Sequence, residues 1–279
     1  MQSHWILEPK PSTGLTVSLT HAASLMQILG MGHQHAVAEG LLGLLQEHVP
    51  LAQCTIFAHE GTRAPRIVAV GDRSRTQTLA DIAEAYVTRF YRLDGCMTAM
   101  REELSAARKA GMQHPRIVMH RQTGSDIAHD EYRHVCYERP QVAERLALLA
   151  LFEGRRWLSV NLYRGIEHGP FDPRSLDVVS AFAPLIVHAV RLHHTGQSVN
   201  QELGDLLLAR LRLRHPYLTP RDCDVVRCLL DGLSTTAMAE RLGLTLASAR
   251  TYVKRVYRKL GVSGQRDLIG MLLEPGRKV

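Results

Sequence analysis

The chain has 279 residues, 45% of them hydrophobic and 22% charged, which allows one large or two ordinary globular domains and excludes disorder along its whole length. The sequence has no run of eighteen apolar residues that would predict a membrane span, and its N-terminus shows no export signal. We therefore expect a cytoplasmic protein without membrane contact. Of the net charge of +7, +5 lies from Thr219 onward, where eleven basic residues face six acidic ones. A local basic excess is typical of surfaces that meet nucleic-acid phosphates.

The first 194 residues alternate between helical and strand patterns. Apolar residues at helical spacing predict helices over 33–48, 79–92 and 97–110. Short runs rich in β-branched residues predict strands over 54–58, 66–70 and 116–120, and a hairpin formed by 145–152 and 157–163. In the second hairpin strand apolar and polar residues alternate, which predicts one buried and one exposed face. Asp172 is placed to cap a last helix that begins at Pro173. About five strands with flanking helices make an α+β domain.

The order of these elements resembles that of GAF and PAS sensory domains. The stretch GPFDPRSLDVVSAFAPLIVHAV, residues 169–190, is similar to the closing helix of a GAF domain. The resemblance implies that residues 1–194 form a sensor for a small-molecule effector or a protein partner. A dimerisation module without any ligand is the alternative.

Residues 195–217 have the composition of a linker. They open with the turn-prone residues Thr195–Ser198 and close near Pro216, which should prevent a helix from continuing. Between these ends, leucines recur at helical spacing at 203, 206, 207 and 211, so a short amphipathic helix is expected within the linker.

From Leu218 the pattern changes to short capped helices. Thr219, Ser234 and Thr245 are placed as N-caps, and Gly232 and Gly243 end the first two helices. Two short helices joined by a glycine-containing turn, over about 235–254, predict a helix-turn-helix motif.

The third of these helices has an apolar side and a basic side. Its apolar stripe consists of Leu246, Ala249, Val253, Val256 and Leu260. The residues predicted to face the DNA major groove are Thr245, Ala247, Arg250, Thr251 and Lys254. Those predicted nearer the phosphates are Ser248, Tyr252, Arg255, Arg258 and Lys259, and Thr235 on the preceding helix completes the DNA-binding set.

These residues carry a family resemblance. The segment LTPRDCDVVRCLLDGLSTTAMAERLGLTLASARTYVKRVYRKLGV, residues 218–262, resembles the LuxR-type helix-turn-helix, with departures that include Asp222 for Glu, Arg250 for Lys and Tyr252 for His. The resemblance implies a four-helix DNA-binding domain over 218–279, with residues 263–273 as the fourth helix. It further implies a sequence-specific transcription regulator that binds double-stranded DNA as a homodimer, with RNA polymerase as a candidate partner.

Within that family, quorum-sensing members that bind acyl-homoserine lactones are an alternative. Tyr86, Tyr91 and Asp94 in AYVTRFYRLDG are similar to the lactone-binding region, although Gly95 stands where proline is expected and the expected tryptophan is absent. Control by phosphotransfer is not expected, because the regular βα repeats of a receiver domain are missing.

No pattern in the chain indicates an enzyme, a cofactor or a metal. The histidine pairs His33/His35, His129/His134 and His193/His194 lack the spacing of a metal site, and GMGHQH, residues 30–35, lacks the third glycine of a dinucleotide fingerprint. The five cysteines are scattered, so we expect reduced thiols, with Cys54 and Cys136 as buried structural residues rather than oxidant sensors.

Overall fold

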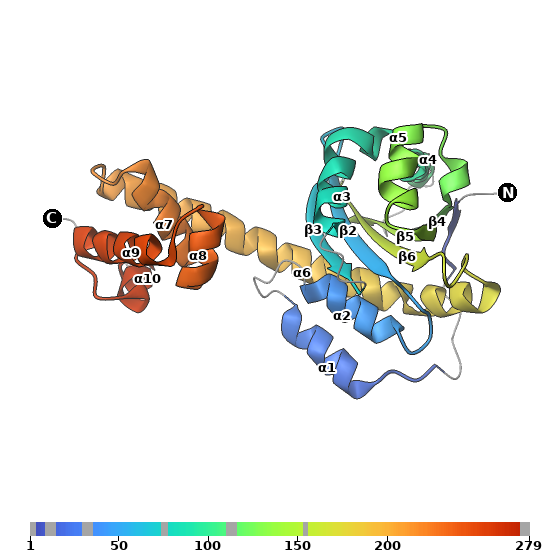
Figure 1. Ribbon diagram of the computed structural model, residues 1–279, viewed down its shortest axis with the longest axis horizontal. Helices are drawn as coiled ribbons and strands as arrows, with labels where there is room; N and C mark the ends of the chain where they lie inside the picture. The colour runs from blue at the N-terminus through green and yellow to red at the C-terminus, as the bar shows by residue number, and fades with distance from the viewer. Residues whose placement is uncertain are drawn as a thin grey trace. The chain divides into compact units, whose positions relative to one another are not determined.

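The computed structural model describes residues 4–8, 15–29, 36–73, 78–109, 116–152 and 156–273. It divides into two compact units, Met1–His194 and Thr195–Val279. The first unit combines helices with a sheet and the second is helical, which confirms the two predicted fold classes (Figure 1).

A six-stranded antiparallel sheet forms the centre of the first unit. Its strand order is β1-β4-β5-β6-β2-β3. The strands are β1 His4–Ile6, β2 Gln53–Glu60, β3 Arg66–Asp72, β4 Ile117–Gln122, β5 Val142–Phe152 and β6 Arg156–Gly165. The prediction of about five strands missed β1, because three residues cannot show an alternating pattern. This strand extends the sheet edge by pairing Trp5 with Met119 of β4.

Both faces of the sheet are covered, contrary to the expectation for residues 157–163. Leu158, Val160 and Leu162 are buried as predicted, but Ser159 and Asn161 on the opposite face are also only 2–3% exposed. The reason lies in the second layer of helices, which the alternation along one strand does not reveal. In β5 the same double coverage is visible in the sequence, where Leu146 to Leu149 are all apolar and fully buried.

Two helices cover one sheet face, α2 Ala36–Leu45 and the first part of α6 Pro173–Arg214, and a third, α1 Leu19–Ile28, packs on the outer side of α2 (Figure 1). Of the helix predicted over 33–48, residues 33–35 lie outside the described residues, and α1 was not predicted at all. Its apolar residues do not form a continuous stripe, and Leu25 is its one buried residue.

The other face carries α3 Leu79–Ala85, the π-helical turn η1 Tyr86–Phe90, the 3-10 turn η2 Tyr91–Leu93 and α4 Gly95–Lys109. The 3-10 turn η3 Gly124–Asp126, α5 Asp130–Arg133 and the π-helical turn η4 His134–Glu138 complete this layer. The predicted helix 79–92 thus corresponds to three successive segments, the α-helix α3, the π-helical turn η1 and the 3-10 turn η2. The polar cluster and the cleft described below both lie between this layer and the sheet.

Helix α6 runs through the segment predicted as a linker. The predicted cap is confirmed, since Asp172 Oδ1 accepts a hydrogen bond from Ser175 N at 2.7 Å. The turn predicted at Thr195–Ser198 is wrong, because these residues are helical and the helix ends only at Arg214. One glycine inside a helix costs about 1 kcal/mol and need not end it. The portion Pro173–Gly196 is long and apolar enough to cross a membrane, but its buried side chains pack in the core against the sheet, so we interpret it as a core helix.

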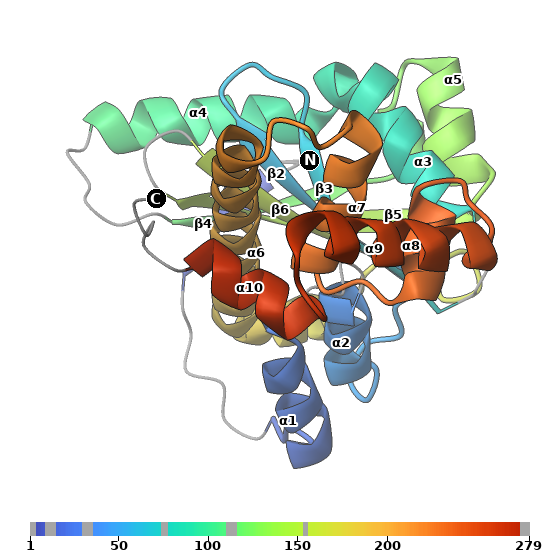
Figure 2. The same ribbon diagram turned by 90° about the vertical axis from the view of Figure 1, so that its left-hand side faces the viewer.

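The second unit contains the last part of α6 and four shorter helices (Figure 2). These are α7 Pro220–Leu230, α8 Thr235–Arg241, α9 Leu246–Leu260 and α10 Gln265–Leu273, of which α10 is the expected fourth helix. Their core includes Val225, Met238, Val256 and Leu268, and the fully buried Leu211 of α6 joins it.

Candidate functional site

The helices of the helix-turn-helix begin at N-cap residues that the sequence predicts. Thr219, Ser234 and Thr245 each accept a hydrogen bond from the backbone N–H three residues on, which confirms the three predicted N-caps. Gly232 and Gly243 adopt φ angles of 73° and 62°, a left-handed conformation that glycine takes without steric cost. These two glycines end α7 and α8, so that α9 begins a short turn after α8.

One side of α9 presents an unpaired basic surface. Thr245, Ala247, Arg250, Thr251, Lys254 and Arg258 are all exposed, so the five residues predicted to face the groove do reach the surface. Arg250, Lys254 and Arg258 follow one another at i, i+4 and i+8, and none of them forms an ion pair with a described residue. Leu246, predicted on the buried stripe, is 39% exposed because it occupies the first helical position, beyond the packing of α7.

Two other basic residues of α9, which were predicted to lie nearer the phosphates, form ion pairs within the domain. Arg255 Nη2 lies 2.6 Å from Asp222 Oδ1, and Lys259 Nζ lies 2.7 Å from Asp222 Oδ2. Asp222 is fully buried and also closes a capping box with Thr219 at the start of α7. Burial alone would raise the pKa of Asp222, but the hydrogen bonds from Lys259, Thr219 and Arg255 hold it well below its ordinary value. These contacts fasten α9 to α7.

The remaining predicted DNA contacts are partly buried. Tyr252 packs against the domain core with Arg255 stacked 4.5 Å from its ring centroid. Ser248 donates its backbone N–H to Thr245 Oγ1 at 3.2 Å, and Thr235 is half-buried in the first turn of α8. These three side chains border the exposed basic surface rather than forming it.

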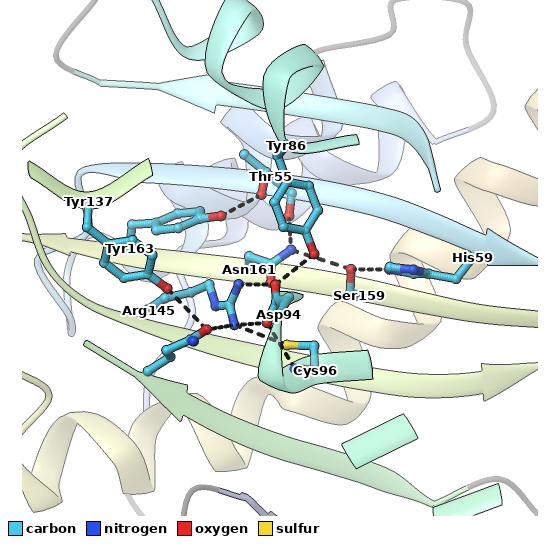
Figure 3. Close-up of polar contacts among 11 residues, drawn as sticks. Thr55, His59, Tyr86, Asp94, Cys96, Tyr137, Arg145, Ser159, Asn161 and Tyr163 are labelled. Carbon is cyan, nitrogen blue, oxygen red and sulfur yellow. Dashed lines mark hydrogen bonds and ion pairs between the residues drawn. The ribbon is translucent and has the colours of Figure 1, made fainter. Parts of the chain in front are cut away.

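A buried polar cluster lies between the sheet and the helices of the first unit (Figure 3). Arg145 of β5 donates to both carboxylate oxygens of Asp94, at 2.5 and 2.7 Å, and the two side chains are 3% and 0% exposed. Tyr86 Oη donates to Asp94 Oδ2 at 2.7 Å, and Cys96 N donates to Asp94 Oδ1 at 2.9 Å. Burial would raise the pKa of Asp94, but Arg145 and these hydrogen bonds hold it well below its ordinary value. Asp94 is therefore an ionised carboxylate whose four hydrogen bonds all come from the protein.

The cavity beside this cluster is small. Its lining includes Tyr86, Tyr132, Tyr137, Tyr163 and Arg145, and its volume of about 20 Å³ has room for about one water molecule. Of the residues similar to the lactone-binding region, Tyr86 and Asp94 come together here, whereas Tyr91 lies apart and lines a different cleft. A ligand of lactone size would have to displace aromatic side chains and exchange hydrogen bonds of Asp94.

Arg145 and Asp222 are the two residues whose role the sequence analysis missed. The charged pair Glu144-Arg145, directly before the apolar run of β5, was a signal for buried ion pairs, but it did not identify Asp94, 51 residues before Arg145, as a partner. Asp222 was noted only as a departure from the glutamate of the LuxR-type pattern, which gave no indication of its contacts with α9.

The described histidines of the predicted pairs lie in helices or at a helix start, and the cysteines are buried. His129 Nδ1 accepts from Tyr132 N at the start of α5, His134 lies 3.0 Å from Glu138, and His193 and His194 are buried on α6. Among the described residues, no three His, Cys, Asp or Glu side chains gather as metal ligands, and the 30–35 stretch with His33 and His35 lies outside them.

All five cysteines are buried and unbridged. Burial raises the pKa of Cys54 and of Cys136 to about 12, which disfavours the reactive thiolate.

Residues 216–272 match the family model described as bacterial regulatory proteins, luxR family. Over 140 residues the chain is 26% identical to the transcriptional regulatory protein MctR of Rhizobium johnstonii, a match that covers 50% of this chain and 62% of that protein.

Several solved structures are similar to the chain at low sequence identity, among them the two that follow. The LBD domain of VqsR from Pseudomonas aeruginosa has a TM-score of 0.42 and 13% identity, over 63% of this chain and 96% of that one. SdiA of Escherichia coli has a TM-score of 0.37 and 12% identity, over 91% and 98%. The family match coincides with the capped helices α7 to α10 and the basic surface of α9. The chain therefore carries a LuxR-family helix-turn-helix domain at its C-terminal end and is a homologue of a bacterial transcriptional regulator.

Proposed function

We propose that this protein is a cytoplasmic transcription regulator that binds double-stranded DNA through the exposed side of α9, under the control of its first unit. The observation that carries the proposal is the row of three unpaired cations, Arg250, Lys254 and Arg258, on a helix without any acidic residue. An α-helix fits the major groove, where arginine and lysine donate to guanine O6 and N7.

The proposed contacts divide by position along α9. Arg250, Thr251 and Lys254 would meet base edges, and the exposed Leu246 and Ala247 supply apolar atoms for a thymine methyl group. Arg258, one turn further along, would meet a phosphate. Arg255 and Lys259 hold the helix in place through Asp222.

Replacement of Arg250 or Lys254 by alanine is expected to weaken binding to the preferred DNA site by about 1–3 kcal/mol for each lost base contact, and to relax the sequence preference. The measurement is the selection of preferred sites from random DNA by the full chain, followed by titration of that site by each variant. Arg266→Ala removes an exposed cation of α10 in the same unit and serves as the control. Unchanged affinity and sequence preference in the Arg250→Ala/Lys254→Ala double variant would assign recognition to another surface.

We further propose that the protein is a homodimer paired along α6. Leu185 and Leu192, on the part of α6 that belongs to the first unit, lie seven residues apart and are 47% and 49% exposed. Leucines repeated every seven residues form the seam of a coiled coil, so a second copy of the same helix is the partner that fits.

The double substitution Leu185→Asp/Leu192→Asp is expected to convert the dimer to a monomer, because it places two carboxylates of each chain in an apolar seam. Sedimentation equilibrium measures the change. The variant should also bind a two-half-site DNA more weakly, since each monomer then binds alone. Ile166→Asp, which changes another exposed apolar residue of the first unit, should leave the dimer intact. A double variant that remains dimeric would place the interface elsewhere.

A further inference from the structure

An apolar cleft of the first unit lies between α4, the end of β2 and the start of β6. Its volume is about 440 Å³, within the range of about 300–1,000 Å³ that small-molecule sites occupy. The buried side chains of Trp157, Met100 and Tyr91 form its floor, and the half-buried Met97 and Leu104 form a wall. Thioether sulfur and aromatic rings pack well against an aromatic or bulky apolar group.

A buried polar atom in the cleft lining also lacks a hydrogen-bond partner among the described residues. His59 lines the cleft and is 3% exposed; its Nε2 lies 3.0 Å from Ser159 Oγ, whereas its buried Nδ1 has no hydrogen-bond partner in the described part of the chain (Figure 3). Burial lowers the pKa of His59 to about 4, so the ring is neutral at pH 7 and can offer a hydrogen bond. A buried nitrogen without a partner is unfavourable unless a ligand satisfies it.

Two arginines stand at the cleft margin. Arg92 uses Nε to donate to Tyr91 Oη at 2.9 Å, and Arg101 uses Nε to donate to the carbonyl oxygen of Met97 at 3.0 Å. Among the described residues neither guanidinium pairs with a carboxylate. Their terminal nitrogens therefore remain available, and a guanidinium matches the geometry of a carboxylate.

We propose that this cleft binds a small monocarboxylate with an aromatic or branched apolar body. Arg92 and Arg101 hold the carboxylate, Trp157 and the two methionines contact the body, and His59 accepts or donates one hydrogen bond. The carboxylate would be the effector through which the first unit controls DNA binding. This physiological role rests on the function proposed above. The cleft shares no lining residue with the cavity beside Asp94, so it is a separate site.

The position of Trp157 provides a direct measurement. The chain has two tryptophans, Trp5 and Trp157, so a full-length Trp5→Phe variant leaves the cleft residue as the sole tryptophan. Titration of this variant with 3-phenylpropionate is expected to change its emission saturably. The uncharged 3-phenylpropanamide should bind at least about tenfold more weakly, which corresponds to the loss of one charge-assisted hydrogen bond. Comparison with 3-cyclohexylpropionate shows whether the site prefers an aromatic or a saturated body.

In the same background, Arg92→Ala and Arg101→Ala should each weaken carboxylate binding about tenfold. Arg174→Ala, which removes an exposed arginine of α6 outside the cleft, should leave it unchanged. Isothermal titration calorimetry of the same samples detects binding that does not alter the fluorescence. Equal affinity for acid and amide, or no binding of any carboxylate by either method, would overturn the proposal. Because neither measurement involves DNA, failure here is distinguishable from failure of the DNA-binding proposal.

Discussion

Replacement of Asp94 by asparagine is expected to destabilise the first unit by about 3–5 kcal/mol, because it leaves the charge of Arg145 buried without its counter-charge. The side chain of Arg145 is 3% exposed and is shielded from bulk solvent in the folded state. Tyr86 Oη loses its carboxylate acceptor at the same time. The double variant Asp94→Leu/Arg145→Met should recover much of this loss, since apolar residues of similar volume can replace a buried ion pair.

Tryptophan fluorescence during urea unfolding measures this effect in the first unit alone, because Trp5 and Trp157 both belong to it. Asp177→Asn, at an exposed position of α6, is the matched control and should change stability by less than about 0.5 kcal/mol. An Asp94→Asn chain as stable as the unaltered protein would contradict the assignment of a charged, buried pair.

The same pair predicts a pH dependence. The pKa of Asp94 in the folded protein lies below its ordinary value of 3.8, so the folded state favours the ionised form. The ionised Asp94 contributes its full stabilisation at pH values above the pKa of this carboxyl in the unfolded chain. The stabilisation is lost as the pH falls from that pKa toward the lower pKa of the folded protein. The difference in unfolding free energy between the unaltered chain and Asp94→Asn should therefore narrow as the pH is lowered through this acid range.

Substitution of Asp222 by alanine is expected to destabilise the second unit by about 2–4 kcal/mol, the sum of a lost cap and lost charge-assisted hydrogen bonds. This loss of stability should be smaller than the loss expected for Asp94→Asn, because Arg255 and Lys259 are 33% and 29% exposed and can be partly hydrated. The second unit contains no tryptophan, so its unfolding should appear as a loss of helical circular dichroism that precedes the fluorescence transition. Asp224→Ala, which removes an exposed neighbour on α7, is the control, and equal unfolding curves for the two variants would contradict the role given to Asp222.

The C-terminal helices could be predicted closely because their signals are local. Thr219, Ser234 and Thr245 accept hydrogen bonds from residues only three positions away, and the glycines that end the helices act on adjacent backbone. The exposed side of α9 follows from helical periodicity alone. The inward orientation of Arg255 could not be predicted, because it depends on Asp222, 33 residues earlier on another helix.

The first unit was harder to predict for the same reason. Strand β1 exists only through its pairing with β4, more than a hundred residues away, and its three residues carry no pattern of their own. The burial of Ser159 and Asn161 depends on the helices that cover the second sheet face. The Asp94–Arg145 pair likewise depends on a contact between the helical layer, which carries Asp94, and the sheet, which carries Arg145. Residue patterns gave the fold class and most elements, but contacts between distant segments decide which polar groups are buried together.

The attachment of Arg255 and Lys259 to Asp222 also bears on how DNA affinity should respond to salt. Helix α9 has five cations, yet two already have a protein counter-charge and are not free to neutralise a phosphate and displace its counterions. Each neutralised phosphate adds about −0.9 to the slope of log affinity against log salt, so α9 contributes no more than about −2.7 per chain instead of the −4.5 that its five cations suggest. Recognition by this helix should thus depend less on ionic strength, and more on base contacts, than its composition implies.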